Sequence, residues 1–319
     1  MNDSKILTED RFSLIKKGPL GTCWYGKYHY IEPWIGCEHN CVYCYARQRG
    51  EVVEKMKEMG VQFEKPRLLF ERGKLLSEIA EGIEKHQVKI VKLSRYTDFF
   101  SPEFVKNGLS AEILETLGKS SAERLIITTK GVPDANCIKM MEKYKDKISY
   151  NAAIKPDTKL VLEPGTRKAE TRIEAAAKIA ALNIKTTVHM DPLTIGVDEL
   201  SDMEPFFIKL KKNGLTRLMF SFLLLNQNFI DYMNLKLGKE ATLEILKNFD
   251  VENDKKFLPK LDERFISTNE TIKKDYACKI GDMLKKHGFD FVICSLKSTR
   301  GGPEFKVPNC PSCDGTFYA

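Results

Sequence analysis

The chain contains no long apolar run, and this absence limits what kind of protein it is. The longest apolar stretch lies around Leu218 to Leu225, which is too short to span a bilayer. The first residues, Met1-Asn-Asp-Ser-Lys-Ile, lack the apolar core of a secretory signal peptide. We therefore expect a cytoplasmic protein with no membrane partner.

A disulfide framework is missing as well. The 9 cysteines are an odd number, and they gather mainly at two places, around Cys41 and around Cys310. Small secreted scaffolds instead carry an even number of cysteines at regular spacings. This usage indicates metal ligands in a reducing compartment.

A strong excess of one charge is also absent. The chain has 51 basic and 44 acidic residues, a net charge of +7. The basic residues are spread along the chain, and runs such as Lys209-Leu-Lys211-Lys212 are typical of a solvated helix face. This balance is compatible with a nucleic-acid partner but does not require one.

What the chain has is a repeated alternation of apolar strands and amphipathic helices, which predicts βαβ units with a parallel sheet, an α/β fold. A hydrophobic content of 42% supports a sizeable core. The expected strands cover residues 28–34, 88–94, 124–129, 148–153, 184–190 and 218–223. The expected helices include 75–85, 112–117, 171–181 and 204–212.

The alternation stops after residue 225, and this break suggests three parts. Residues 1–225 carry the strand and helix alternation, and residues 226–288 are expected to form a helical insertion or lid with a helix over 272–287. Residues 289–319 are expected to form a short strand and a cysteine-rich tail.

Three cysteines form the most informative motif, Cys37-Glu-His-Asn-Cys41-Val-Tyr-Cys44. Three soft thiolates within eight residues suit one 4Fe–4S cube and leave its fourth iron open for a substrate or cofactor. The alternative is a zinc loop with His39 as the fourth ligand. Zinc knuckles, however, more often repeat a Cys-x2-Cys pair at a distance.

The spacing of these cysteines and the aromatic Tyr43 before the last one resemble the signature of the radical S-adenosylmethionine (SAM) superfamily. The resemblance implies that SAM binds the open iron and that the reduced cluster cleaves SAM to a 5′-deoxyadenosyl radical. That radical abstracts a hydrogen atom from a substrate. It also implies a partial (β/α)6 barrel and an electron donor such as flavodoxin or ferredoxin.

The order of further motifs is similar to one branch of the superfamily, that of spore photoproduct lyase. The matching pieces span about residues 30 to 200, and they are Gly36 to Arg47, Thr97-Asp98, Thr129-Lys130, Glu163-Pro164-Gly165 with Arg172, and Asp191-Pro192-Leu193. The lyase has a cysteine, a few dozen residues after the cluster motif, that returns a hydrogen atom to the product radical. This chain has no cysteine between Cys44 and Cys137. Ser94 and Tyr96 lie in that zone, and Tyr96 is the candidate catalytic hydrogen donor.

Polar residues at the ends of the expected strands are candidates for binding SAM, because ligand sites of parallel barrels lie at that edge. Lys130 would pair with the SAM carboxylate, and Asp98 or Glu163 would hold its ribose hydroxyls or amino group. The cofactor-binding candidates are Tyr43, Ser94, Asp98, Thr129, Lys130, Asn151, Glu163, Arg172 and His189.

Several of these residues also have a structural interpretation. Lys130 could be a surface lysine, and Arg172 could be a helix-surface arginine paired with Glu163. Tyr43 is expected near the adenine of SAM, with core packing as the alternative. His189 fits a ligand or proton relay, or equally a satisfied histidine at a strand end.

A second cysteine group, Cys294 with Cys310-Pro-Ser-Cys313, predicts a second metal site. Its arrangement is similar to the C-terminal cysteines of the radical SAM enzyme of molybdenum-cofactor biosynthesis, which hold a substrate-binding second cluster. A second 4Fe–4S cluster is the first interpretation. Zinc completed by His287 or Cys278, or no metal, are the alternatives.

These motifs lead to one functional prediction with two alternatives. The first is a radical SAM enzyme acting on a small molecule, peptide or nucleotide held near an auxiliary C-terminal cluster. The second is a nucleic-acid repair or base-modifying enzyme of the spore photoproduct lyase type. The third, of another class, is a zinc-binding nucleic-acid module.

Overall fold

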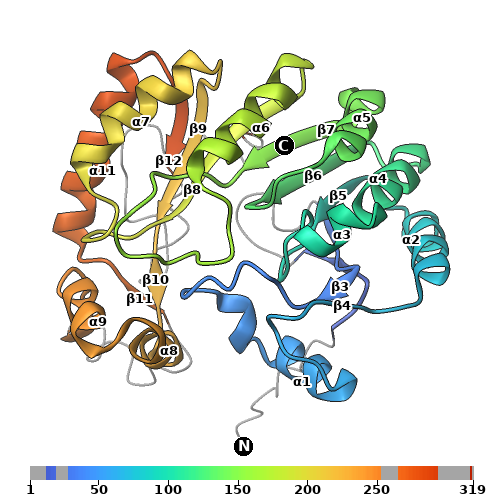
Figure 1. The fold of residues 1–319 in the computed structure, drawn as a ribbon, viewed down its shortest axis with the longest axis horizontal. Helices are drawn as coiled ribbons and strands as arrows, with labels where there is room; N and C mark the ends of the chain where they lie inside the picture. The colour runs from blue at the N-terminus through green and yellow to red at the C-terminus, as the bar shows by residue number, and fades with distance from the viewer. Residues whose placement is uncertain (1–11, 19–27, 253–264, 294–316, 318–319) are drawn as a thin grey trace, which may run out of the picture.

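The predicted alternation of strands and helices forms a parallel α/β sheet. The computed structural model describes residues 12–18, 28–252, 265–293 and 317. Within this part of the chain, eight strands form one sheet in the order β1-β2-β5-β6-β7-β8-β9-β12 (Figure 1). They are β1 (Ile15–Lys17), β2 (His29–Ile31), β5 (Ile90–Leu93), β6 (Arg124–Thr129), β7 (Ile148–Ala152), β8 (Lys185–Leu193), β9 (Arg217–Phe222) and β12 (Asp290–Ile293).

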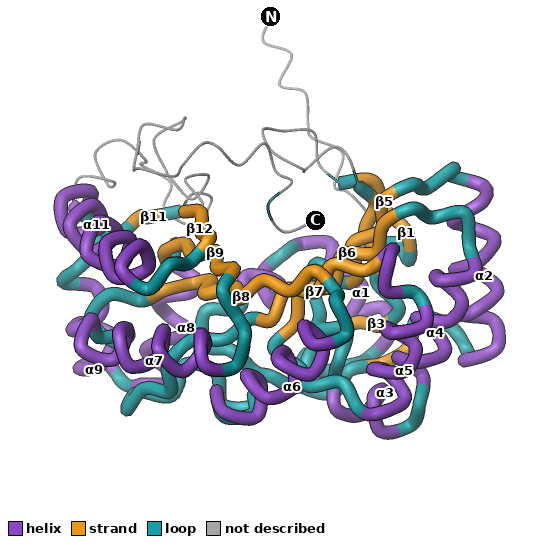
Figure 2. The backbone as a smooth tube through the Cα atoms, turned by 90° about the horizontal axis from the view of Figure 1, so that it is seen from above, coloured by secondary structure: helices purple, strands orange, loops and turns teal. Residues whose placement is uncertain are grey.

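Within this sheet, the strands from β2 to β12 run parallel, and only β1 pairs in the antiparallel sense. Consecutive parallel strands require crossovers, and helices supply them. Figure 2 shows these helices on one side of the curved sheet. They are α2 (Arg72–Lys85), α3 (Pro102–Lys106), α4 (Leu109–Lys119), α5 (Ala135–Lys143), α6 (Ala169–Ala181) and α7 (Leu200–Lys212).

The main core lies between this helical layer and the sheet. Side chains at every second strand position, such as Val91 and Leu93 of β5 and Leu125 and Ile127 of β6, are fully buried there. The period of two directs one apolar set toward the helices.

The first expected strand, 28–34, is wrong as one element. It is divided into β2 and a short β3 (Trp34–Ile35), which pairs instead with β4 (Arg67–Leu68). Glu32 and Pro33 separate the two, and proline has no N–H to donate to a continuous ladder. The chain thereby leaves the main sheet just before Cys37.

Beyond β9 the segment predicted as a helical insertion contains short strands as well as helices. Its elements are β10 (Leu224–Leu225), α8 (Gln227–Leu237), α9 (Lys239–Leu246), β11 (Ile266–Ser267) and α11 (Glu270–Lys286). A short 3-10 helix η1 (Tyr45–Gln48), helix α1 (Gly50–Met59) and 3-10 helix η2 (Lys145–Lys147) complete the described elements. None of the described helices has the length and apolar character of a membrane span. The division at residues 225 and 288 stays a prediction, although β12 joins the main sheet beside β9.

Candidate active site

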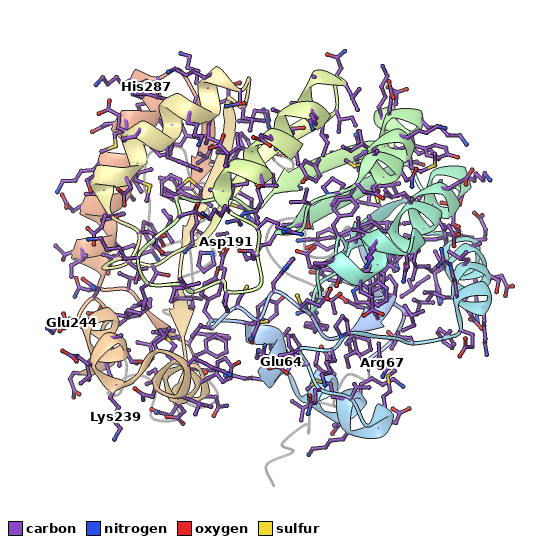
Figure 3. The ribbon with its side chains drawn as sticks, viewed as in Figure 1. Glu64, Arg67, Asp191, Lys239, Glu244 and His287 are labelled. Carbon is purple, nitrogen blue, oxygen red and sulfur yellow. The ribbon has the colours of Figure 1, made fainter. Side chains whose placement is uncertain are left out.

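A cavity of about 450 Å³ opens where the parallel strands end. Such a volume is within the usual range for small-molecule sites. Its wall includes Ser94 after β5, Thr129 in β6 and Asp191 in β8. In Figure 3 Asp191 lies near the middle of the molecule, whereas Lys239, Glu244 and His287 lie at its periphery.

The three motif cysteines line one side of this cavity. Cys37 and Cys41 are each 8% exposed, and Cys44 is half-buried. Burial raises the pKa of all three thiols, so binding a metal here must displace their protons. The three soft donors on one cavity wall fit the three-cysteine cluster that the sequence predicts.

Two neighbouring segments hold the cysteine loop by backbone hydrogen bonds. The N–H of Cys37 donates to the carbonyl of Phe63 at 2.7 Å, and the N–H of Val42 donates to that of Leu162 at 2.9 Å. The N–H of Gly165 donates to the carbonyl of His39, also at 2.9 Å. The Leu162 to Gly165 segment therefore supports the loop directly.

Gly165 is required by this close approach. A Cβ atom built there would lie only 2.1 Å from the carbonyl oxygen of Glu38. No side chain fits such a contact unless the backbone moves. This explains the glycine of the Glu163-Pro164-Gly165 run in physical terms.

Arg47 supports the same loop from its other side. Its guanidinium lies 4.4 Å from the ring centroid of Phe63 and 5.1 Å from that of Tyr232 on α8. It also donates to the side-chain oxygens of Asn40 and Glu64. Asn40 has a left-handed backbone, with φ of 51°, so these contacts fix the turn between Cys37 and Cys41.

The contacts of His39 argue against a role as a zinc ligand. Its Nε2 lies 3.2 Å from Oδ2 of Asp98, and its Nδ1 lies 3.4 Å from the carbonyl oxygen of Gly165. Burial alone would lower the pKa of His39, but Asp98 outweighs burial and raises it. Both ring nitrogens thus face protein oxygens, which argues against His39 as a fourth zinc ligand. Among the described residues, no three His, Cys, Asp or Glu side chains lie close enough to share one ion.

Asp98 is held by protein donors at both oxygens. Oδ1 accepts from the N–H of Phe100 at 3.0 Å and from the hydroxyl of Thr129, and Oδ2 accepts from the N–H of Lys130 at 2.7 Å. Burial would raise its pKa, but His39 and these hydrogen bonds lower it to about 2. Asp98 therefore joins the cysteine loop to the end of β6.

Glu163 lies at the centre of a buried charge network. Its Oε1 is 3.3 Å from Nζ of Lys130, its Oε2 is 3.3 Å from Nη1 of Arg172, and it accepts from the hydroxyl of Tyr43. Burial would raise the pKa of Glu163, but Lys130, Lys155 and Arg172 together hold it well below its usual range. The carboxylate thus stays charged inside the protein.

Lys155 extends this network toward β8. Its Nζ lies 2.9 Å from Oδ2 of Asp198 and donates to the carbonyl of Pro192 at 3.3 Å. Lys130 and Lys155 also lie over the ring of Tyr43, 5.8 and 5.7 Å from its centroid. Tyr43 is therefore fixed by two cations and one carboxylate, beside two of the motif cysteines.

The segment after β5 forms another wall of the cavity. Ser94 has a φ of 66°, and both Ser94 and Tyr96 are buried. The hydroxyl of Tyr96 donates to Glu51 of α1. Behind this wall, buried Glu32 accepts from the N–H of Tyr96 at 3.0 Å and from that of Arg95.

Most of the predicted site residues come together here. Those that line the cavity are Cys37, Cys41, Tyr43, Cys44, Ser94, Tyr96, Asp98, Thr129, Lys130 and His189. Glu163 and Arg172 lie behind the wall, and Asn151 is 1% exposed within β7, where its Nδ2 donates to the carbonyl of Ile127. Arg172 pairs with Glu163 as one alternative proposed, yet it is 5% exposed rather than at the surface. Cys294, Cys310 and Cys313 lie outside the described residues.

Sequence reasoning missed several residues of the site. Lys155, Glu32 and Arg95 received no role, although a carboxylate inside the apolar run before Trp34 was an available signal for Glu32. An apolar wall was also missed, and its residues are Leu223, Leu224, Phe229 and Phe265. It comes partly from the insertion, whose sequence shows only helical amphipathicity.

A parallel α/β sheet with a buried three-cysteine loop at its C-terminal edge defines the fold and the site. No protein-family model matches the chain, and no curated protein matches it. Among solved structures, spore photoproduct lyase complexed with dinucleoside spore photoproduct matches with a TM-score of 0.58 and 14% identity, over 83% of this chain and 75% of that chain. A double mutant of the lyase, with bound AdoMet and dinucleoside spore photoproduct, matches with a TM-score of 0.59 and 14% identity, over 86% and 78%. The resemblance found in the motifs is thus confirmed in the fold.

Proposed function

We propose that this protein is a radical SAM enzyme that binds a 4Fe–4S cluster through Cys37, Cys41 and Cys44. The observation that supports it is the placement of all three thiols on one wall of a cavity large enough for a cofactor. The fold shared with spore photoproduct lyase agrees with it. The curved sheet from β2 to β9 would then be the partial (β/α)6 barrel, with β12 added at its edge.

When bound, the cluster and SAM supply a 5′-deoxyadenosyl radical that abstracts a hydrogen atom from the substrate. The protein's own residues position and shield these groups. Lys130 offers its ammonium to the SAM carboxylate, and Glu163 keeps that lysine charged and oriented at 3.3 Å. Phe229 and Phe265 line the same cavity and would exclude water from it.

The proposal is tested by anaerobic reconstitution of the full chain with iron and sulfide. We expect about four irons per chain at the first site and formation of 5′-deoxyadenosine from SAM after reduction. Cys41→Ala should abolish that product. The matched control is Cys278→Ala, because Cys278 is exposed on α11. Undiminished 5′-deoxyadenosine from Cys41→Ala would refute the assignment.

We further propose an auxiliary 4Fe–4S cluster on Cys294, Cys310 and Cys313 near the substrate. This proposal rests on the sequence, and zinc is its rival. Two clusters would raise the iron content to about eight per chain, and replacing the three cysteines by alanine would return it to about four. About four irons and one zinc would instead support a structural zinc site.

A second candidate is a nucleic-acid repair or base-modifying enzyme. It is favoured by the fold of spore photoproduct lyase and by Arg49, Lys92 and Arg95 in the cavity wall. Tyr96 would be the hydrogen donor in place of the lyase cysteine. Its hydroxyl donates to Glu51. Tyr96→Phe removes this O–H group, so it should change the products without changing SAM cleavage. Anaerobic incubation with a dinucleotide lesion tests this candidate directly.

The remaining partners follow from the proposed reaction. A one-electron donor such as flavodoxin or ferredoxin would reduce the cluster. A cytoplasmic location would keep the cysteines reduced. Reduction by purified flavodoxin, followed by the appearance of 5′-deoxyadenosine, tests the donor.

A further inference from the structure

One wall of the cavity is cationic. Arg49, Lys92 and Arg95 all line it. The acidic side chains that line the cavity are Asp98 and Asp191, and both already contact protein groups. Asp98 has the donors described above, while Asp191 accepts from the hydroxyl of Ser221 and lies 3.7 Å from Nε2 of His189.

Arg95 is stacked on two aromatic rings. Its guanidinium carbon lies 4.8 Å from the ring centroid of Tyr96 and 5.2 Å from that of Tyr30. Stacking on aromatic rings uses the faces of the guanidinium and leaves its in-plane N–H donors for an acceptor. These two rings therefore select an orientation for Arg95 before any ligand arrives.

No carboxylate of the described residues forms an ion pair with Arg95. The charge of Glu51 acts on Arg95, but Glu51 already has other partners. Its Oε2 lies 2.8 Å from Nζ of Lys16, and it accepts from the hydroxyl of Tyr96. This contrasts with Arg172, whose guanidinium is matched to Glu163 inside the protein.

The backbone beneath Arg95 is held in place as well. Buried Glu32 accepts from the N–H of Arg95, from the N–H of Tyr96 at 3.0 Å and from the hydroxyl of Thr97 at 3.2 Å. Ser94, with its left-handed φ of 66°, turns the chain at the end of β5. Preorganisation of this kind lowers the cost of ordering a binding residue.

We propose that Arg95 is the specificity residue for an oxyanion, a phosphate or a carboxylate, carried by the substrate. The inference rests on the proposed function and names the substrate class of the same cavity. Arginine suits this role because its planar fork binds two oxygens of either group. The SAM carboxylate is assigned to Lys130, which lies at the end of β6, so the two anions have separate receptors.

Binding to the reconstituted full-length protein tests this inference without requiring turnover. The probes are phenyl phosphate, phenylacetate and phenylacetamide, which share an aromatic body and differ in the polar group. Calorimetry should show that at least one anion binds about tenfold or more tightly than the neutral amide. The tighter of the two anions identifies the group as phosphate or carboxylate.

Variants assign the preference to Arg95. Arg95→Gln should abolish the preference for the anion, and Arg95→Lys should restore part of it, because lysine keeps the charge but not the fork. The matched control is Arg124→Gln at the opposite end of β6, where the arginine contacts the carbonyl of Asp146. Iron content and circular dichroism verify that each variant is folded.

Two results would overturn the inference. One is an anion preference that survives in Arg95→Gln or is missing from the wild-type protein. The other is a tenfold loss of SAM affinity in Arg95→Gln, which would place Arg95 in the cofactor subsite. Absence of 5′-deoxyadenosine from a protein that keeps the Arg95-dependent preference would instead count against the proposed function alone.

Discussion

The two charged sides of the cavity differ in how their charges are compensated. Behind the cysteine loop, cations and carboxylates are matched within the protein, as in Lys130 and Arg172 with Glu163 and Lys155 with Asp198. On the side formed by the segment after β5, Arg95 is stacked on tyrosine rings, and no described carboxylate pairs with it. We call the first side the framework, because its charges are paired within the protein, and the second the receptor side, because Arg95 has no such pair among the described residues.

This difference separates two physical tasks. A buried charge pair with additional hydrogen bonds keeps its geometry because breaking one partner leaves an uncompensated charge. Such a network is suited to holding a cofactor loop in one position. A stacked cation that forms no ion pair with a described carboxylate can still bind an incoming anion through its N–H donors, so it is suited to selecting substrates.

The largest expected effect comes from disturbing the framework at Gly165. In Gly165→Ala the new methyl group would lie 2.1 Å from the carbonyl oxygen of Glu38, so the cysteine loop must move. We expect the iron held by Cys37, Cys41 and Cys44 to fall from about four to below about one per chain, measured as the loss of iron relative to the wild-type protein after reconstitution.

The control for this change is Gly73→Ala, because a Cβ at Gly73 on α2 meets no atom within 4 Å. It should keep its iron and gain about 0.5–1 kcal/mol in unfolding free energy from helix propensity. Full iron content in Gly165→Ala would show that the loop does not depend on this contact.

A smaller effect is expected from removing one charge of the framework. Lys130→Ala should weaken SAM binding at least about tenfold while the cluster remains, because one partner of a buried charge contact is worth about 2–5 kcal/mol. Electron paramagnetic resonance of the reduced protein during SAM titration measures this. Lys143→Ala, at an exposed lysine of α5, is the control. An unchanged titration curve would remove Lys130 from the SAM site.

On the receptor side, the titration of Glu32 should make the free energy of unfolding depend on pH. Burial raises the pKa of Glu32 from an ordinary value of 4.5 to about 7. Below pH 4.5 both the folded and the unfolded chain hold this proton. Between pH 4.5 and 7 only the folded chain keeps it, so the free energy of unfolding falls as pH rises through this window. The contribution is roughly 3 kcal/mol.

Glu32→Gln should remove this dependence, because glutamine does not titrate. Urea unfolding at pH 5, 6, 7 and 8 should show that the stability of the wild-type protein relative to the variant declines with pH. Glu81→Gln, at an exposed glutamate of α2, should leave the profile unchanged. Parallel pH profiles for wild type and Glu32→Gln would contradict the assignment.

The smallest effect is expected at an exposed ion pair outside both regions. Arg72 and Glu112 lie 2.8 Å apart, and their side chains are 40% and 46% exposed. Solvent screens such pairs, so Arg72→Ala should cost less than about 1 kcal/mol of unfolding free energy. A loss as large as that expected for the buried charges would undermine the contrast between framework and surface.

The alternation of apolar and amphipathic segments was enough to predict the parallel sheet. Helix α6 ends at Ala181 as expected, and the following Asn183 takes a left-handed φ of 61°. The break at Glu32 and Pro33 was missed because the pattern of apolar residues continues across it. A pattern reports which side chains are buried, whereas pairing partners depend on distant segments such as β4.

The cysteines and strand-end residues of the site were also predictable, because their chemistry is local in the sequence. The tertiary partners were not. The role proposed for Arg95 depends in part on its contact with Tyr30. Tyr30 is 65 positions away, and the pairing of β2 with β5 brings it close. Lys155 likewise depends on Asp198, and no short motif contains both residues.

Helix α8 also limits how this protein can be re-engineered. The hydroxyl of Tyr232 donates to Asn40 at 3.2 Å, and its ring lies beside the guanidinium of Arg47. An insertion is usually treated as an exchangeable module, yet this one contains a residue, Tyr232, that contacts the cysteine loop. A chimera that replaces residues 227–246 to change selectivity must keep a tyrosine at position 232. Otherwise the first property to be lost would be iron retention rather than the old selectivity.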